Sequence, residues 1–176
     1  MTSLNKKVAL VTGASQGIGR SIAKRLGSNG VHVLLVALED EHLERTYKEF
    51  SDTITVSKFG IDLTDELALE EMTKEVLHQH TSIDILINNA GIGGPTGPVG
   101  EISSSDWDMT LSINLRVPFL MCRAIAPTMI QAGTGKIINI SSVAGKMAYP
   151  LRTPYAASKW GLIGLTLTLA HELGPH

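Results

Sequence analysis

The chain has 176 residues, of which 43% are hydrophobic and 18% charged, and its formal net charge is −2. This balance is typical of one globular domain with a sizeable core and excludes a disordered or fibrous chain. The 15 basic residues are scattered along the sequence and do not gather into a stripe, so we expect no nucleic-acid partner.

Neither the apolar stretches nor the metal-binding residue types indicate a membrane, a disulfide or a metal site. Asn, Gly or charged residues interrupt every apolar stretch before it reaches the length of a membrane span, and the first apolar run is too short for a secretory signal. The single cysteine, Cys122, lies in an apolar, helix-like run, which is typical of a buried inert thiol. His78 and His80 are two residues apart and do not share a helix face, so we expect no metal. A cytoplasmic location is the default expectation.

Short apolar runs alternate with longer periodic segments along the chain. The expected strands are 8–12, 31–38, 53–59, 83–88 and 136–141, and the expected helices are 17–29, 40–50, 64–80, 104–131 and 154–173. This alternation predicts βαβ units, and the nearly unbroken apolar strands predict a parallel sheet that is covered on both faces. We therefore expect a doubly wound α/β fold, a single Rossmann-like domain over residues 1–176, that binds ligands at the C-terminal ends of its strands.

The last predicted helix ends where this fold pattern leads us to expect another strand. Gly174 and Pro175 are helix-stop signals, and no strand follows them. The predicted strand 136–141 would then lie near an unprotected sheet edge. We expect that the fold lacks its C-terminal strands and that the natural polypeptide continues.

A glycine-rich turn follows the first predicted strand. In "TGASQGIGR" (12–20), Gly13, Gly17 and Gly19 lead into a helix, and glycine allows a tight turn and close approach of the backbone to a ligand. Amide groups at the N-terminus of such a helix bind a pyrophosphate, and the position of the turn in a βαβ series favours nucleotide binding over a merely structural turn. An ATPase or kinase is disfavoured, because Arg20 stands where a phosphate-binding loop of that type needs lysine.

The end of the second predicted strand bears on the choice between NAD and NADP. An acidic residue normally binds the adenosine ribose at this position. The sequence has Ala37 and Leu38 there, with Glu39 and Asp40 just beyond. Ala37 offers no carboxylate to a ribose, and neither Leu38 nor Gln16 offers a cation to a 2′-phosphate, so these residues leave the choice open.

The stretch "TPYAASK" begins the last predicted helix. Thr153 and Pro154 are a suitable N-cap and first helical residue, which places Tyr155 and Lys159 one turn apart on the same face. A nearby ammonium favours the ionised form of a phenol, which would suit Tyr155 for proton transfer to or from a carbonyl or alcohol. Tyrosine and lysine also occur by chance at this spacing on many helix surfaces, so the pair needs support from the rest of the chain.

Two further polar residues are candidates for the same site. Ser142 follows the fifth predicted strand, whose end faces the same crevice as the glycine-rich turn, so its hydroxyl can meet Tyr155 and Lys159 and bind the same substrate oxygen. Asn114 lies inside a predicted helix, where asparagine is unfavourable by propensity, and this hints at a role other than helix formation.

Taken in order, these motifs resemble those of the short-chain dehydrogenase/reductase family. The matching elements are "TGASQGIG" (12–19), Asp62 and Leu63, "NNAG" (88–91), Asn114, Ser142 thirteen residues before Tyr155, and "YAASK" (155–159). The resemblance covers essentially the whole chain, and the set is specific because its members occur together. It implies hydride transfer between a nicotinamide cofactor and a carbonyl or alcohol of a small molecule.

The resemblance also implies a role for each matching residue. Tyr155 would be the acid/base, and Lys159 would tune it and anchor the cofactor ribose. Ser142 would bind the substrate oxygen, and Asn114 would hold a water of the proton relay. The implied cofactor-binding residues are Gly13, Ser15, Gly17, Ile18 and Gly19 at the pyrophosphate, Asp62 and Leu63 at the adenine, and Asn89, Tyr155 and Lys159 along the rest of the cofactor.

Cofactor choice and assembly follow from the same resemblance. Relatives that use NADP often carry Arg after the residue corresponding to Ala37, and those that use NAD often carry Asp in its place. Ala37 followed by Leu38 gives a weak preference for NADP over NAD. Members commonly form dimers and tetramers through the helices corresponding to 104–131 and 154–173, and the stretch "GLIGLTLTLA" is apolar on more than one face, so we expect a homo-oligomer, either a dimer or a homotetramer.

The sequence leaves other functions open. One alternative is a catalytically inactive nucleotide-binding sensor or scaffold, and another is an epimerase or dehydratase, which shares Tyr-x-x-x-Lys but fits the glycine spacing less well. The full set of catalytic residue types favours the oxidoreductase. An acyl-carrier reductase is disfavoured, because "MIQAGTGKI" (129–137) lacks the basic residues often used to dock an acidic carrier. The broader expectation is a polyol, a sugar or an acyl derivative.

Overall fold

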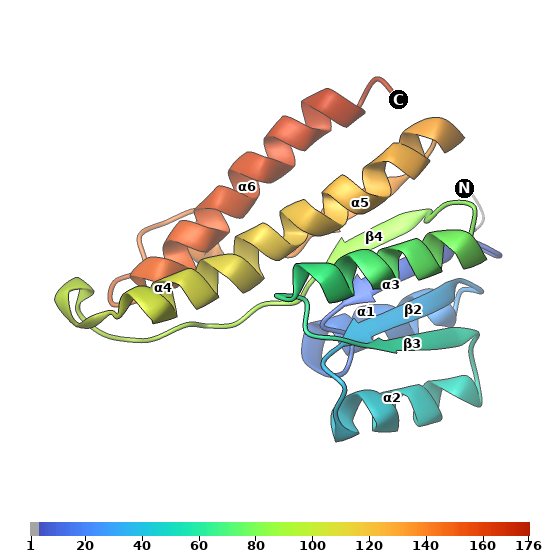
Figure 1. Ribbon diagram of the computed structural model, residues 1–176, viewed down its shortest axis with the longest axis horizontal. Coiled ribbons are helices and arrows are strands. Elements are labelled where there is room, and N and C mark those ends of the chain that lie inside the picture. The colour runs from blue at the N-terminus through green and yellow to red at the C-terminus, as the bar shows by residue number, and fades with distance from the viewer. Residues whose placement is uncertain (1–3) are drawn as a thin grey trace.

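Five parallel strands lie in the order β3-β2-β1-β4-β5 in the computed structural model, which describes residues 4–176 (Figure 1). The strands are β1 (Val8–Thr12), β2 (His32–Ala37), β3 (Val56–Gly60), β4 (Ile85–Asn88) and β5 (Lys136–Asn139). The chain first builds outward from β1 to β3 and then returns to add β4 and β5 on the other side. This confirms the predicted doubly wound α/β fold and places its ligand crevice at the C-terminal ends of β1 and β4, where the direction of winding reverses.

The helices alternate with the strands as the sequence periodicity predicts. They are α1 (Gly17–Gly27), α2 (Glu41–Ser51), α3 (Glu66–Gln79), α4 (Ser104–Leu111), α5 (Val117–Ala132) and α6 (Thr153–Leu173). Short 3-10 turns occupy Val99–Glu101 (η1) and Val143–Gly145 (η3), and a π-turn, Ser112–Arg116 (η2), joins α4 to α5. The helix predicted over 104–131 is therefore continuous, but its middle is a single π-helical turn.

Alternate side chains of the strands enter two separate cores, one on each face of the sheet. Leu10, Leu34 and Leu86 pack with residues of α3 and α5 on one face. Val11 and Leu35, which neighbour them along the strands, point the other way and pack with residues of α1 and α2. Figure 1 shows α3 and α5 on the near side of the sheet. Both faces of β1, β2 and β4 are thus covered, which explains why these strands are apolar at nearly every position.

The continuous helical stretch Ser104–Ala132 is, among the described residues 4–176, the one helix long and apolar enough by length and mean hydropathy to cross a membrane. The expectation that polar residues interrupt every such stretch is therefore wrong here. Half of its apolar window is buried within the protein. Leu120, Met121 and Ile125 lie in the core next to β4, so this hydropathy is that of a core helix.

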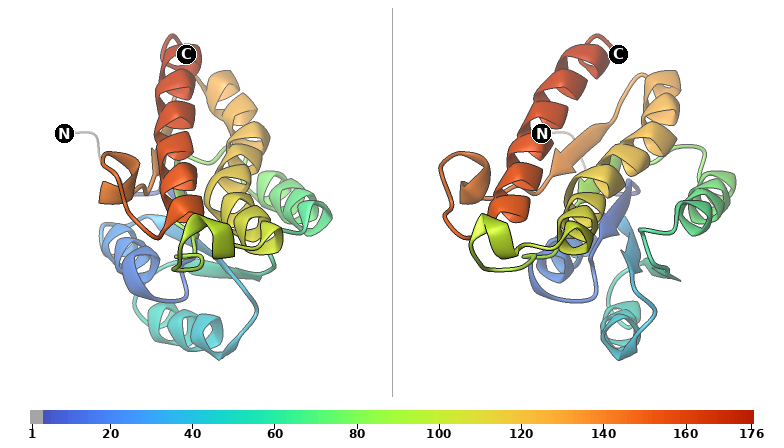
Figure 2. Two further views of the ribbon diagram at one scale, coloured as in Figure 1. Left: turned by 90° about the vertical axis from the view of Figure 1, so that its left-hand side faces the viewer. Right: turned by 60° about the vertical axis from the view of Figure 1, so that its left-hand side comes forward.

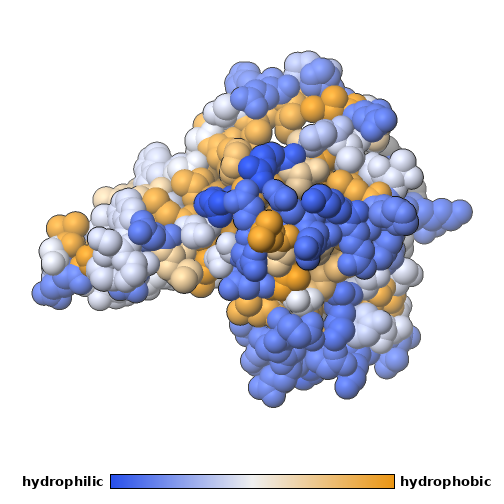
Figure 3. Space-filling view, viewed as in Figure 1, coloured by the Kyte–Doolittle hydropathy of each residue, from blue (hydrophilic) through white to orange (hydrophobic). Residues whose placement is uncertain are grey.

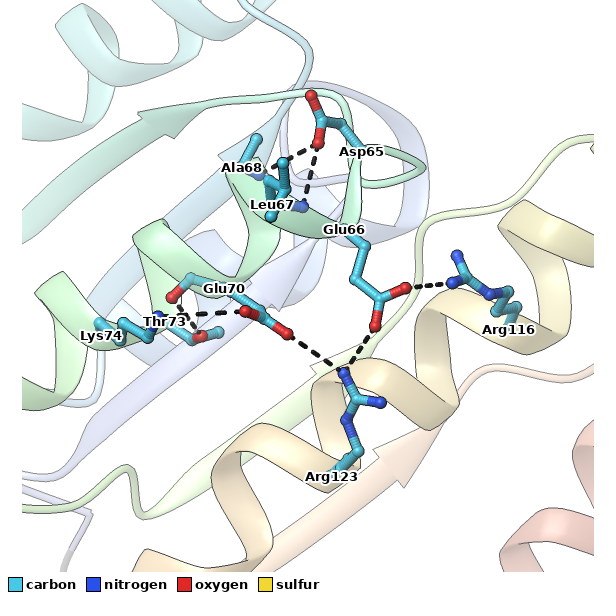
Figure 4. A network of polar contacts seen from close by, with 9 residues as sticks. All are labelled: Asp65, Glu66, Leu67, Ala68, Glu70, Thr73, Lys74, Arg116 and Arg123. Atoms are coloured by element: carbon cyan, nitrogen blue, oxygen red, sulfur yellow. Dashed lines mark hydrogen bonds and ion pairs between the residues drawn. The ribbon is translucent and has the colours of Figure 1, made fainter.

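Charged side chains on the surface tie α3 to the region where the π-turn meets α5. Glu66 of α3 pairs with both Arg116 and Arg123, and Arg123 also reaches Glu70 at 3.5 Å (Figure 4). The hydrogen bond from Arg123, together with the charge of Arg116, lowers the pKa of Glu66. The network is exposed and therefore screened by salt, and its role is to fix the position of one helix on another.

β5 forms one edge of the sheet, as the sequence predicted. It pairs with β4 alone, and its side chains at Lys136 and Ile138 are exposed. α5 and α6 run side by side above it, and η3 lies beside the first turns of α6 (Figure 2). The C-terminal end of β5 is thereby brought against α6, the helix that carries Tyr155 and Lys159.

Candidate active site

The glycine-rich turn after β1 is packed so closely that two of its positions accept no side chain. Gly13 has a φ of +63°, in the left-handed region that glycine adopts most readily. A Cβ atom at Gly19 would overlap the carbonyl oxygen of Gly13 and the side-chain nitrogen of Asn89. Gly19 therefore allows the first turn of α1 to lie directly on the end of β1.

The N-terminus of α1 differs from that of the next three helices. Asp40, Asp65 and Ser103 cap α2, α3 and α4 by accepting hydrogen bonds from backbone N–H groups. Gln16, the N-cap residue of α1, makes no such side-chain bond, and nothing lies within 4 Å of the Cβ position of Gly17. Uncapped N–H groups beside open space fit the pyrophosphate of a dinucleotide, so the residues present suit this group.

Thr12 and Asn89 join the two strands at the switch point. The hydroxyl of Thr12 accepts hydrogen bonds of 3.0 Å from the backbone N–H groups of Asn89 and Ala90. The side-chain amide of Asn89 in turn donates to the carbonyls of Thr12 and Gly13. Asn89 thus lies against the glycine-rich turn, and its contact with a cofactor stays a prediction. Thr12 was missed, because a threonine at the end of a strand carries no signal of its own in the sequence.

α6 presents Tyr155 and Lys159 on one face near its beginning. The helix begins at Thr153, with Arg152 as the N-cap residue, so the prediction of Thr153 as a side-chain N-cap is wrong by one position. Tyr155 is half-buried, whereas Lys159 is only 5% exposed. The Lys159 Nζ lies 5.8 Å from the centre of the Tyr155 ring. The predicted pair is therefore close in space, and its cation is shielded from water.

The end of β5 holds Lys159 in place. The Lys159 ammonium donates a 2.9 Å hydrogen bond to the carbonyl oxygen of Ile140, and burial lowers the pKa of Lys159. The Ser141 hydroxyl donates to the backbone carbonyl of Lys159 at 3.2 Å, and a Cβ atom at Gly145 would lie 2.7 Å from that same oxygen. The segment after β5 thus packs directly on the turn of α6 that carries the pair.

Ser142 belongs to this segment. Its hydroxyl accepts a 3.2 Å hydrogen bond from the backbone N–H of Ala144 and so caps η3. The side chain is half-buried. Its own O–H hydrogen has no protein acceptor among the hydrogen bonds of the described residues, so the hydroxyl retains a donor for a substrate oxygen.

Asn114 lies at the centre of the π-turn and is fully buried. Its oxygen accepts from the N–H of Ile92 at 2.8 Å, and its nitrogen donates to the carbonyl of Ile92 and to the Ser158 hydroxyl. A Cβ atom at Gly91 would lie 3.0 Å from the Asn114 oxygen and 3.6 Å from the Lys159 Nζ. Asn114 therefore fixes the loop after β4 beside Lys159, and its role in holding a water stays a prediction.

The other predicted cofactor residues surround the crevice without converging on one point. Asp62 is exposed beyond the end of β3, and its carboxylate accepts hydrogen bonds from the backbone and hydroxyl of Thr64, while Leu63 is buried. Ile18 is 63% exposed on the first turn of α1. The carbonyl of Ser15 accepts a 2.8 Å bond from Thr46 of α2. Their contacts with a cofactor stay predictions.

Cys122 and the pair formed by His32 and His80 have packed surroundings of their own. Cys122 is buried, its sulfur accepts a 3.4 Å bond from Asn88, and burial raises the pKa of the thiol to about 11. The prediction of a buried, inert thiol is therefore confirmed. His80 packs its ring against His32, with centroids 5.1 Å apart. Within residues 4–176, no three His, Cys, Asp or Glu side chains are grouped so that they could hold a metal ion.

Comparison with known proteins agrees with this geometry. Gluconate 5-dehydrogenase of Gluconobacter oxydans is 39% identical over 99% of this chain and 68% of its own length. Among solved structures, a metagenomic short-chain oxidoreductase in complex with NADP has a TM-score of 0.94 and 43% identity, over 99% of this chain and 80% of that one. NAD+-bound xylitol dehydrogenase has a TM-score of 0.94 and 34% identity, over 99% of this chain and 67% of that one.

The family model for short chain dehydrogenases matches residues 7–176. The chain spans 62% to 69% of the length of the curated relatives that it matches. The matched region includes the glycine-rich turn, the loop after β4, the segment after β5 and the first turns of α6. On this evidence the chain belongs to the short-chain dehydrogenase family.

Proposed function

We propose that the protein is an NAD(P)-dependent oxidoreductase that transfers a hydride between nicotinamide and a secondary alcohol or carbonyl compound. The observation that carries this proposal is the buried ammonium of Lys159 beside the Tyr155 ring, at the strand ends where α1 begins without a side-chain cap. Membership in the family supports it, as do the solved relatives that contain NADP and NAD+.

Tyr155 is the acid/base in this proposal. The nicotinamide supplies or accepts the hydride. When an alcohol is oxidised, its hydroxyl proton passes to the Tyr155 oxygen, and in reduction the phenol returns that proton to the carbonyl oxygen. The Ser142 hydroxyl donates a hydrogen bond to the same oxygen and stabilises the negative charge that develops there.

Lys159 and Asn114 organise the site around this proton transfer. The positive charge of Lys159 stabilises the phenolate, and its shielding from water strengthens that effect. Asn114 holds Gly91 and Ile92 against the ammonium and so shapes the wall of the crevice. Thr12 and Asn89 fix the end of β4 against the glycine-rich turn, and together these groups would hold the cofactor.

The end of β2 supports a preference for NADP only weakly. The carboxylate of Glu39 lies over Gly60 and pairs with Lys58 at 3.3 Å, so its negative charge is partly compensated. Leu38 is 59% exposed beside it. A compensated carboxylate repels a 2′-phosphate less than a free one does, and we therefore expect NADP(H) to bind at least as well as NAD(H).

We also propose a homo-oligomer, a dimer or tetramer, assembled through the α4–α5 stretch and α6. Large apolar side chains on these helices are exposed, including Phe119 at 45%, Trp160 at 52% and Leu167 at 61%. Apolar residues reach the surface over the α5–α6 region in the upper half of Figure 3. Exposed apolar groups gathered on two neighbouring helices are typical of a protein interface.

The test begins with titration of the purified protein with NADH and NADPH, followed by nicotinamide fluorescence, and continues with turnover of xylitol and gluconate. Tyr155→Phe should bind the cofactor within a few-fold of the wild type and lose turnover by about a hundredfold or more. Tyr149→Phe is the matched control, since that exposed ring lies 6.3 Å from the Tyr155 ring, and it should keep turnover. Turnover that survives in Tyr155→Phe would contradict the mechanism, and cofactor binding without turnover of any alcohol would favour a nucleotide sensor.

A further inference from the structure

Arg152 lies at the entrance to the site, directly before α6. Its guanidinium carbon is 5.4 Å from the centre of the Tyr155 ring. One of its terminal nitrogens donates a 2.6 Å hydrogen bond to the carbonyl of Gly93, in the loop after β4. The guanidinium therefore bridges that loop and the ring of the proposed acid/base.

The charge of Arg152 has no counter-ion in the protein. No carboxylate of residues 4–176 lies within ion-pair distance of it, whereas Arg20, Arg116 and Arg123 each pair with a glutamate. Arg25 and Arg45 also lack a carboxylate partner, but they are exposed, whereas Arg152 is half-buried. Its Nε atom is buried and has no hydrogen-bond partner. A buried donor without a partner costs free energy, so an unpaired guanidinium beside an active site indicates a missing anionic partner.

The backbone before Arg152 is held in an unusual conformation. Leu151 has a φ of +63°, which is uncommon for a residue other than glycine. Its carbonyl accepts a 2.9 Å hydrogen bond from the N–H of Gly97, so the loop after β4 fixes this conformation. Such conformations are frequent at ligand-binding sites, because there the surrounding contacts maintain them. Here the strain fixes the point from which the Arg152 side chain extends towards Tyr155.

We propose that Arg152 binds a carboxylate of the substrate and makes the enzyme selective for short hydroxy or keto acids. This inference rests on the oxidoreductase function proposed above. A guanidinium presents its donors in a planar fork that matches a carboxylate, and such charge-assisted bonds are stronger than those to a neutral hydroxyl. Because the guanidinium and the phenol ring are neighbours, the carboxylate and the reacting carbon belong to the same small molecule. The relative named for gluconate is named for a substrate that carries such a group.

The experiment compares hydroxy acids with neutral alcohols in which a hydroxymethyl group replaces the carboxylate. The two probe pairs are 3-hydroxybutyrate with butane-1,3-diol, and gluconate with sorbitol, which cover a short and a longer carbon chain. Turnover is measured for the wild type with the cofactor that binds better. Binding is measured by calorimetry in the Tyr155→Phe background with oxidised cofactor bound, where the chemical step is blocked.

We expect an acid to be preferred over its matched alcohol by about tenfold or more in kcat/KM and in affinity, in at least one pair. Arg152→Gln should lower the kcat/KM and the affinity for the acid by about tenfold more than those for its matched alcohol, and so abolish that preference. Arg152→Lys keeps the charge but loses the fork, so it should retain part of the preference. Arg25→Gln removes an exposed arginine of α1 and should change neither the acid preference nor the turnover of the neutral alcohol. Thermal unfolding of each variant shows whether its fold is intact.

The outcomes separate this inference from the proposed function. No acid preference in either pair, or a preference that persists in Arg152→Gln, overturns the role of Arg152 while cofactor binding and alcohol turnover still support the oxidoreductase. A wild type that binds neither NADH nor NADPH contradicts the proposed function itself. If Arg152→Gln fails to fold, Arg152→Lys tests the inference in its place. An acid preference that is fully retained in Arg152→Lys would show that the planar guanidinium has no role in binding the carboxylate.

Discussion

The Nζ atom of Lys159 donates a 2.9 Å hydrogen bond to the carbonyl oxygen of Ile140, the first residue after β5. This bond connects the first turns of α6 to the C-terminal end of the sheet. The same ammonium lies 5.8 Å from the centre of the Tyr155 ring. The buried Lys159 cation thus connects the sheet to the proposed acid/base, and its position depends on both β5 and α6.

Replacing Lys159 should therefore affect two properties at once. Lys159→Ala removes the charge that stabilises a phenolate and the group expected to meet the cofactor ribose, so turnover should fall by about a hundredfold or more and NAD(P)H should bind more weakly. Fluorescence titration and steady-state rates measure the two effects separately. Lys146→Ala, which removes an exposed lysine directly after η3, is the control. A loss of turnover alone, or of cofactor affinity alone, would show that Lys159 has only one of its two proposed roles.

The close packing at Gly19 predicts a cofactor-binding defect from one added methyl group. In Gly19→Ala the new Cβ overlaps the Gly13 carbonyl and the Asn89 side chain, so the glycine-rich turn must shift. Weaker NAD(P)H binding and a lower melting temperature should result. Gly164→Ala is the matched control, because nothing lies within 4 Å of that Cβ position and alanine in a helix stabilises by up to about 1 kcal/mol. Unchanged cofactor affinity in Gly19→Ala would contradict the role assigned to this turn.

Periodicity in the sequence was sufficient for the order and type of the elements. β1 has the predicted bounds of 8–12, because its apolar run is short and the glycine-rich turn ends it. The third strand begins at Val56 instead of residue 53, since the N–H groups of Thr53 and Ile54 still bond to the Phe50 carbonyl at the end of α2. The β-branched residues Thr53 and Ile54 thus belong to a helix terminus here, and local composition cannot distinguish that from a strand.

The contacts that organise the site depend on residues distant in sequence, and for this reason the sequence did not predict them. Asn114 bonds Ile92 across 22 positions, and Arg152 bonds Gly93 across 59. The π-turn at Asn114 has no local signature, because its extra residue is accommodated by tertiary contacts. Tyr155 and Lys159 were predictable because one helical turn brings them together.

The pair of histidines at the other end of the sheet predicts a loss of stability in mild acid. Burial, and secondly the charge of His80, lowers the pKa of His32 below 6.5. The unfolded chain therefore binds a proton at a higher pH than the folded chain does, and the free energy of unfolding falls as the pH drops below 6.5. Urea unfolding from about pH 7 to 5 should show this fall, and His32→Gln should flatten it. His171→Gln, at an exposed histidine, should leave the slope unchanged.

Asn114 gives the sharpest distinction between a structural and a catalytic defect. Asn114→Ala leaves the N–H and the carbonyl of Ile92, and the Ser158 hydroxyl, without their present partner. Buried polar groups left unsatisfied cost about 1–3 kcal/mol each, so the variant should unfold at markedly lower urea concentration. Asn29→Ala removes an exposed hydrogen bond to the Arg25 carbonyl and should cost far less.

The same variant tests how the loop after β4 serves the site. Because Gly91 lies beside both the Asn114 oxygen and the Lys159 ammonium, a released loop would give water access to Lys159 and weaken the charge that stabilises the phenolate. Turnover, measured well below the melting temperature of the variant, should then fall in addition to the lower stability. Unchanged turnover in an unstable variant would show that Asn114 supports the fold alone. Lower turnover in a variant that is as stable as the wild type would instead place Asn114 within the proton-transfer machinery.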